Sequence, residues 1–276
     1  LRDTHKSLAA YERAVALDPA NPDALRFLGE LQYRIGDLAS AEATFNALIA
    51  LGARTADARA QALALTRLSW IPYQKKDFSS AERLLLDALQ LSKKALWFEG
   101  QARALSNLGN IHTLRGELDR AEEMQLKSLR LDEQLGRKEG MATTYGNLGV
   151  IYGERGDLHL AEDMQLKSLR LNEELGRKEG IANSFANLGA IYQTRGDLDH
   201  AEDIHLKSLR LNEELGRKEG IADSLWNLSI IHGRRDDTRR TCEYLRKARD
   251  LYREIELADK AAEAEKWLRQ RGCEET

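Results

Sequence analysis

Proline, cysteine and aromatic residues are scarce in this sequence. It has three prolines and two cysteines among its 276 residues, and aromatic residues make up 6%. So few prolines, with 32% charged residues, are typical of a helical chain whose surface faces water. Cys242 and Cys273 lie far apart in the sequence, so they predict no disulfide framework. By default this indicates a reducing, cytoplasmic location.

The sequence also lacks an excess of charge of one sign and any long apolar run. Its net charge is −3, which provides no basic field for nucleic acid. No apolar run reaches the roughly 18 residues that a membrane span needs. The opening, LRDTHKSLAAYERAV, has no charged-then-apolar signal-peptide layout. We therefore expect a protein or peptide partner, and neither nucleic acid nor a membrane.

Motifs of catalysis and of metal binding are missing as well. The sequence contains no Gly-rich phosphate loop, no Walker-type lysine and no HExxH. His200 and His205 are the closest histidine pair, and on a helix they would point about 140° apart. We therefore predict that the chain is not an enzyme, with no catalytic residue, no metal site and no cofactor.

What the sequence does contain is one segment repeated along the chain. Residues 137–176 read RKEGMATTYGNLGVIYGERGDLHLAEDMQLKSLRLNEELG, and residues 177–216 read RKEGIANSFANLGAIYQTRGDLDHAEDIHLKSLRLNEELG. A third copy opens at Arg217 and a fourth lies upstream, from Gly100 to Gly136. Self-similarity at a fixed period predicts a solenoid, because each unit buries its apolar face against its neighbours.

Glycine, aspartate and proline mark the ends of the predicted helices. Gly156 and Gly196 separate the two halves of a copy, where a left-handed C-cap suits glycine, and aspartate then opens the next helix. The RGD triplets at 155–157 and 195–197 are therefore interpreted as turns, not as adhesion motifs. Pro72 lies late in a predicted first helix and should kink or end it.

The spacing within each copy resembles that of a known repeat family. The first half holds Tyr145-x-x-Leu148-Gly149-x-x-Tyr152, and the second holds Ala161-x-x-x-Gln165-x-x-Ser168. This spacing resembles the tetratricopeptide (TPR) pattern W-x-x-L-G-x-x-Y…A-x-x-x-F, and the resemblance covers nearly the whole chain. The 40-residue period is similar to that of kinesin light chains, Pins-type polarity adaptors and many bacterial regulatory proteins.

The resemblance implies an all-α, right-handed superhelical solenoid of antiparallel helix pairs with a C-terminal capping helix. We expect a single TPR solenoid over residues 1–276. It would comprise a half repeat (1–19), six repeats (22–52, 56–96, 98–136, 138–176, 178–216 and 218–256) and the capping helix (258–272). The chain begins with Leu1 in the middle of a repeat, which looks like a piece of a longer protein.

The resemblance also implies a concave groove lined by the first helices of the repeats. One inward column then reads Asn107, Asn147, Asn187 and Asn227. An amide side chain can pair with both the N–H and the C=O of an extended peptide, and related 40-residue arrays use Asn in this way. The alternative is that each Asn bonds to a neighbouring helix and only fixes the stack.

Bulkier residues flank this column and are candidate anchors for a partner. Trp70 and Tyr73 lie on one side, with Arg67 and Arg103 near them, and Trp226 lies on the other. Aromatic residues and arginine are enriched among the residues that dominate binding energy. They predict a partner segment with apolar and acidic residues. For Trp226 the alternative is packing against the last helix.

We therefore predict a protein–protein interaction scaffold that binds a peptide segment or helix of a partner in the concave groove. Two other classes stay open. The chain could be the regulatory sensor arm of a larger enzyme or transcription regulator. It could also be a self-assembly module, in which an exposed N-terminal repeat forms a homo-oligomer.

Overall fold

The computed structural model describes the backbone of residues 2–273 and the side chains of residues 7–273, so the expectation for Leu1 lies outside the described residues. In this range the chain is helical and has no strand, which confirms the all-α prediction. No helix in the same range combines the length and the apolar character of a membrane span. The chain divides into two compact units, Leu1–Gly140 (unit 1) and Met141–Thr276 (unit 2). The repeat boundaries expected from the sequence stay a prediction.

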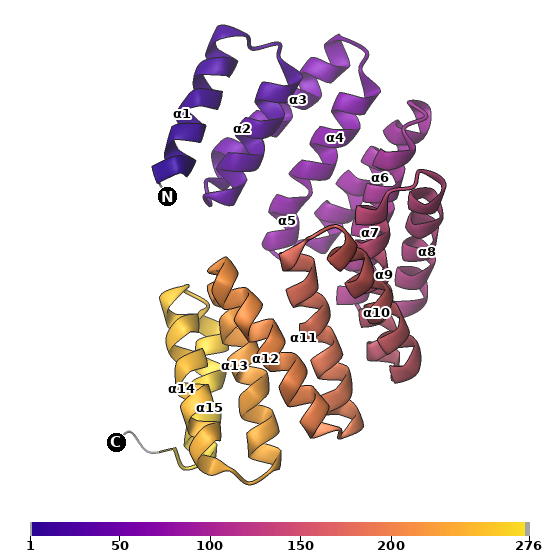
Figure 1. The fold of residues 1–276 in the computed structure, drawn as a ribbon. Helices are drawn as coiled ribbons and strands as arrows, with labels where there is room; N and C mark the ends of the chain where they lie inside the picture. The colour runs from indigo at the N-terminus through magenta and orange to yellow at the C-terminus, as the bar shows by residue number, and fades with distance from the viewer. Residues whose placement is uncertain (1, 274–276) are drawn as a thin grey trace. The chain divides into compact units, whose positions relative to one another are not determined.

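Unit 1 consists of consecutive helices that pack on one another (Figure 1). Helix α2 packs on α3, α3 on α4, α4 on α6, α6 on α7, and α7 on α8. The connections are short, so each helix lies beside the one that precedes it. The helices are α1 (Arg2–Leu17), α2 (Pro22–Arg34), α3 (Leu38–Arg54), α4 (Ala58–Leu68), α5 (Trp70–Gln74), α6 (Phe78–Lys94), α7 (Phe98–Leu114) and α8 (Leu118–Gln134).

The interruption between α4 and α5 confirms the break predicted for Pro72. Helix α4 ends at Leu68, four residues before Pro72. A proline has no N–H to donate, and its ring clashes with the carbonyl of the residue four positions earlier. Ser69 lies between the two helices, and its Oγ donates to the carbonyl of Thr66 over 2.8 Å. The chain then continues as α5, which presents Trp70 and Tyr73.

Unit 2 continues the same arrangement of paired helices. Helix α11 packs on α12, α12 on α13, α13 on α14 and α14 on α15. The last helix, α15, buries Ala261, Ala264 and Leu268. The helices are α9 (Lys138–Arg155), α10 (Leu158–Glu174), α11 (Lys178–Arg195), α12 (Leu198–Leu215), α13 (Lys218–Arg234), α14 (Thr238–Glu254) and α15 (Ala258–Gln270).

The turns follow the predicted chemistry. Gly156 and Gly196 adopt φ angles of +86° and +85°, a left-handed conformation that glycine enters without a Cβ clash. Asp197 occupies the N-cap of α12, and its side chain accepts a hydrogen bond from the N–H of His200. Asp157 occupies the same position before α10 without a side-chain cap bond. Both RGD triplets are thus helix-to-helix turns.

The pair of α9 and α10 is held together where a small residue faces a long one. A Cβ on Gly149 of α9 would lie 2.4 Å from Nε2 of Gln165 on α10, so only glycine fits. The Nε2 atom of Gln165 donates to the carbonyl of Gly146 over 2.8 Å. One turn further along α10, Ser168 Oγ donates to the carbonyl of Ala142, also over 2.8 Å. These contacts fix how α10 lies against α9.

The prediction that the two cysteines stay unpaired is wrong. Cys242 and Cys273 form a disulfide with a Cα–Cα distance of 5.5 Å. Cys242 lies near the start of α14, and α15 runs back along α14, so residues 31 positions apart in sequence meet in space. Gly272, with a φ of +64°, turns the chain at the end of α15 just before Cys273. The cysteines therefore do not indicate a reducing compartment.

Candidate functional site

The four asparagines of the predicted column lie on first helices and are partly buried. Asn107 belongs to α7 in unit 1, and Asn147, Asn187 and Asn227 belong to α9, α11 and α13 in unit 2. Within the described residues, the amides of Asn107, Asn187 and Asn227 bond to no other protein group, whereas Asn147 has a partner. In the described part of the chain, these three asparagines therefore do not form the hydrogen bond to a neighbouring helix that the alternative proposed.

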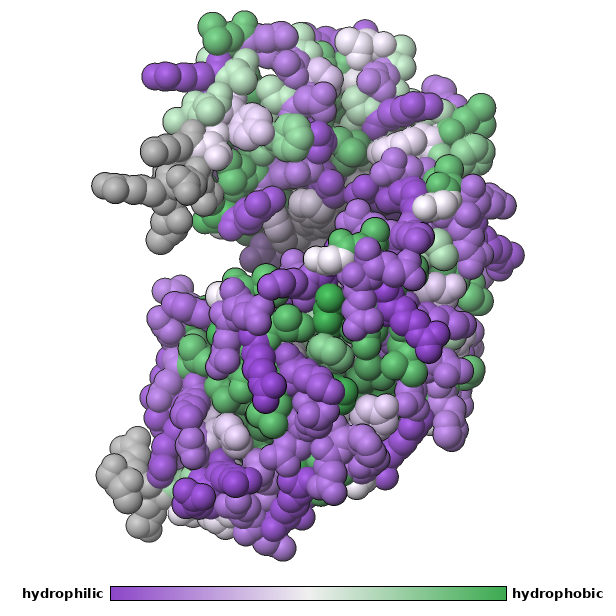
Figure 2. Space-filling view, viewed as in Figure 1, coloured by the Kyte–Doolittle hydropathy of each residue, from purple (hydrophilic) through white to green (hydrophobic). Residues whose placement is uncertain are grey.

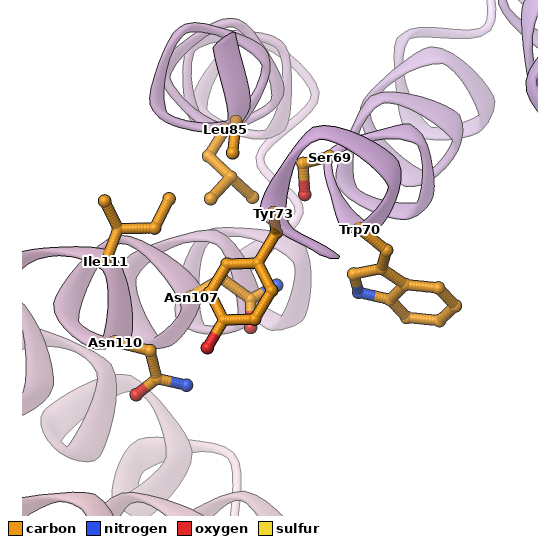
Figure 3. Close-up of a pocket in the computed structure, with 8 residues that line it drawn as sticks. Ser69, Trp70, Tyr73, Leu85, Asn107, Asn110 and Ile111 are labelled. Atoms are coloured by element: carbon orange, nitrogen blue, oxygen red, sulfur yellow. The ribbon is translucent and has the colours of Figure 1, made fainter. Parts of the chain in front are cut away.

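In unit 1, Asn107 lines a pocket of about 170 Å³ together with Trp70 and Tyr73. We call it the Trp70 pocket. The aromatic side chains come from α5, and Asn107, Asn110 and Ile111 come from α7 (Figure 3). Ser69, Ala81 and Leu85 complete the lining. The pocket is larger than the cavity of roughly 150 Å³ that holds a benzene molecule, so it can take one medium-sized apolar side chain.

Arg67 and Arg103 lie near this pocket but already have carboxylate partners. Arg67 Nε donates to Glu30 over 2.6 Å, and its guanidinium lies over the Trp70 ring, 4.4 Å from the centroid. Burial lowers the pKa of Arg67, while Glu30 opposes that shift. Arg103 pairs with Glu99 on its own helix over 2.8 Å. An acidic residue of a partner would therefore compete with two existing ion pairs.

In unit 2, Asn147 and Asn187 line a polar pocket of about 390 Å³ between α9 and α11. We call it the amide pocket, because amide side chains supply much of its wall. Arg177 Nη1 donates to the Oδ1 atom of Asn172 over 3.4 Å at its edge. Its other polar lining residues include Thr143, Glu179, Asn183 and Ser184.

A second pocket of unit 2 is mainly apolar and has a volume of about 240 Å³. We call it the Gly153 pocket. It shares Val150, Gln165 and Asn187 with the amide pocket. The remaining lining residues come from α9, α10 and α11: Gly149, Gly153, Glu154, Leu158, Ala190, Ile191 and Thr194. The polar amide pocket and the apolar Gly153 pocket therefore meet at Asn187.

Gln165 lies between these two pockets and keeps one polar atom without a partner. The side chain is 1% exposed, and its Oε1 atom accepts no hydrogen bond. Its Nε2 atom is occupied by the carbonyl of Gly146. A buried acceptor without a donor destabilises the unbound state, so a ligand N–H that reached it would gain that interaction.

Trp226 and Asn227 lie on α13 and line none of these three pockets. The Trp226 ring contacts Trp267 of the last helix, with 5.6 Å between the ring centroids and a near edge-to-face angle of 63°. Trp226 also packs beside the buried cluster around Leu225 and Tyr252. These contacts agree with the alternative that Trp226 packs against the last helix.

Several lining residues were not singled out from the sequence. Asn110 follows Asn107 by three positions and lies on the same helix face, a spacing that could have identified it. Gln165 was recognised only as a position of the repeat pattern. Its place between two pockets depends on the small residues of α9 opposite it, which a one-dimensional pattern does not reveal.

Among residues 7–273, no group of three metal-ligating side chains is found. His205 is fully buried, and burial lowers its pKa to about 4. His200 is exposed, and its Nδ1 atom lies 2.7 Å from Asp197. His200 and His205 therefore have separate surroundings, although they are only five residues apart.

Comparison with solved structures finds the same fold in proteins of low sequence identity. BtubC (BKLC) from P. vanneervenii is 20% identical with a TM-score of 0.67, covering 79% of this chain and 92% of that one. A STAND protein from Pyrococcus horikoshii, described as having a tetratricopeptide repeat sensor, is 19% identical with a TM-score of 0.72. The alignment covers 95% of this chain but only 40% of that one. The apo form of RapI is 15% identical with a TM-score of 0.65, covering 91% and 97% of the two chains.

The family assignment comes from the sequence profiles. A search of curated proteins found no match. The profile of the MalT-like TPR region matches residues 71–272, and a tetratricopeptide repeat profile matches residues 1–58. The first of these alone spans more than half of the chain. The chain therefore belongs to the tetratricopeptide-repeat family and carries a MalT-like TPR region.

Proposed function

We propose that this chain is a protein-interaction scaffold that binds an extended peptide segment of a partner along its first helices. Membership of the tetratricopeptide family supports a protein-interaction role, and a non-catalytic one. The observation that carries the finer proposal is the amide of Asn187. It is partly buried, bonds to no other described group and borders both pockets of unit 2.

An amide in this position suits the backbone of a peptide. Its carbonyl accepts from a peptide N–H and its NH₂ donates to a peptide C=O, so it needs no particular partner side chain. Asn147 lines the same pocket one repeat earlier, so two amides border the path that we propose for the peptide. The pockets beside them would then select side chains. This division of roles, in which backbone contacts hold the peptide and pockets select it, is usual for extended peptides.

The test is capture of a partner from native cell lysate with matched variants. The double variant Asn147→Ala with Asn187→Ala should lose the partner that the wild type retains. It should also keep its helical circular dichroism, because these side chains lie outside the packed core. Asn46→Ala, an exposed asparagine on α3, serves as the control and should capture normally. Equal capture by the double variant and the wild type would refute the proposal.

A sensor arm of a larger protein is a second candidate. It is favoured by the MalT-like profile and by the similarity to a STAND protein whose description includes a repeat sensor. In that case the peptide or protein bound here would control another domain of the same polypeptide. The full-length coding sequence tests this directly. A nucleotide-binding or DNA-binding domain encoded in frame would support it, and a sequence of repeats alone would contradict it.

A further inference from the structure

Helix α9 contains four glycines, and two of them, Gly149 and Gly153, have different surroundings. A Cβ on Gly149 would lie 2.4 Å from Gln165, so packing excludes a side chain there. A Cβ on Gly153 would meet only the Cβ of Ala161, at 4.0 Å, which is an ordinary contact. Glycine destabilises a helix interior relative to alanine. Since no packing contact requires Gly153 to be glycine, the space that it leaves open calls for another explanation.

That space is the Gly153 pocket. Its apolar wall includes Val150, Leu158 and Ile191. Its volume of about 240 Å³ exceeds the roughly 150 Å³ of a cavity that binds benzene. A Leu, Ile, Met or Phe side chain therefore fits within it. Figure 2 shows that apolar side chains also reach the surface among polar ones on the face of unit 2 turned to the viewer.

The polar groups around the pocket define what accompanies that side chain. Asn187 offers a free amide for the backbone, and Gln165 Oε1 is a buried acceptor without a partner. Glu154 also lines the pocket, and its exposed carboxylate has no ion pair among the described residues. An unpaired carboxylate at an apolar pocket complements a cation.

We propose that the Gly153 pocket binds one medium-sized apolar side chain of an extended partner segment that also carries a nearby lysine or arginine. This inference rests on the proposed function, because it names the chemistry of the peptide that the scaffold would select. In an extended segment, successive side chains point to opposite sides, so residues two positions apart point the same way. The apolar residue can therefore enter the pocket while its backbone faces Asn187 and a cationic residue two positions away reaches Glu154.

A phage-displayed library of random 12-residue peptides, selected on the wild-type chain, provides the probe. We expect enrichment of sequences that combine one apolar residue with a nearby lysine or arginine. The best of these peptides is then measured by fluorescence anisotropy. Gly153→Leu fills the pocket and should weaken binding about tenfold or more, as expected for losing the burial of one side chain. Glu154→Gln should weaken it a few-fold, and high salt should remove that difference.

Ala43→Leu is the matched control. Ala43 is exposed on α3 and lines neither pocket of unit 2, so this variant adds a leucine outside the proposed site. It should bind within about threefold of the wild type. Circular dichroism melts should show that neither variant is less stable than the wild type, which separates loss of binding from loss of fold.

The outcomes distinguish this inference from the function on which it rests. If Gly153→Leu binds as tightly as the wild type, or the enriched peptides lack the apolar and cationic pair, the pocket inference is wrong. The scaffold function survives that result if Asn147→Ala with Asn187→Ala still abolishes binding. If no peptide is enriched, or the double variant binds normally, both the function and the inference fail.

Discussion

His205 of α12 lies against Gly189 of α11, so closely that a Cβ built on Gly189 would fall 2.6 Å from the imidazole ring. His205 takes the position that glutamine takes in the two preceding repeats, at Gln125 and Gln165. Both glutamines donate to a backbone carbonyl, whereas neither ring nitrogen of His205 has a partner. The repeat has thus exchanged a hydrogen-bonded amide for a buried titratable ring.

This exchange predicts acid sensitivity. Burial lowers the pKa of His205 from 6.5 to about 4, so the folded chain resists the proton that the unfolded chain binds. The contribution to stability is present above pH 6.5 and is lost as the pH falls toward 4. By linkage the loss amounts to about 3 kcal/mol. Urea unfolding at pH 7.5 and pH 4.5 should show that His205→Gln is less destabilised by acid than the wild type.

The reverse substitution is the control. Gln165→His places the same ring in the preceding repeat and should increase the loss of stability between the two pH values. If His205→Gln and the wild type lose equal stability on acidification, His205 is not the group that responds. The comparison uses differences between variants, because carboxylates elsewhere also titrate in this range.

Two alanine substitutions at helical glycines should act in opposite directions. Gly189→Ala pushes a methyl group into the buried ring of His205, and overpacking of this kind costs about 1–3 kcal/mol. Gly153→Ala meets no close neighbour and should stabilise α9 by about 0.5–1 kcal/mol through the better helix propensity of alanine. Thermal melts of the two variants measure this. Shifts in the same direction would contradict the assignment of the two glycines.

The glycines of α9 show how far the sequence alone could predict this structure. The helix pairs, the left-handed turn at Gly156 and the break before Pro72 follow from local rules and a fixed period, and all were predicted. Gly149 and Gly153 are one helical turn apart and look equivalent in the sequence. One is imposed by Gln165 opposite it and the other is not, a distinction that depends on the partner helix. The outlines of the pockets of unit 2 depend on such differences between neighbouring helices.

The sequence identified the asparagine column, Trp70 and Tyr73 as candidates, but not how the fold groups them into pockets. The asparagine column repeats every 40 residues, so its members could be identified from the period. The Trp70 pocket instead depends on the break before Pro72, which starts a new short helix at Trp70. Trp226 stood out as an aromatic residue, yet the path of α15 decides that it contacts Trp267.

The pairing of Cys242 with Cys273 also depends on the path of α15, and it predicts redox-dependent stability. The disulfide closes a loop across a sequence separation of 31 residues and ties the end of α15 to the start of α14. Closing a loop of this length should stabilise the fold by about 3–4 kcal/mol through the unfolded chain. A reductant should therefore lower the free energy of unfolding and speed amide hydrogen exchange in α15, which buries Leu268 and contacts Trp226.

Cys273→Ser should match the reduced wild type and no longer respond to reductant. Cys242 is 7% exposed, so its replacement would confuse disulfide loss with a core defect, and Cys273 is the better position to change. Equal exchange in α15 with and without reductant would show that packing alone holds the last helix in place.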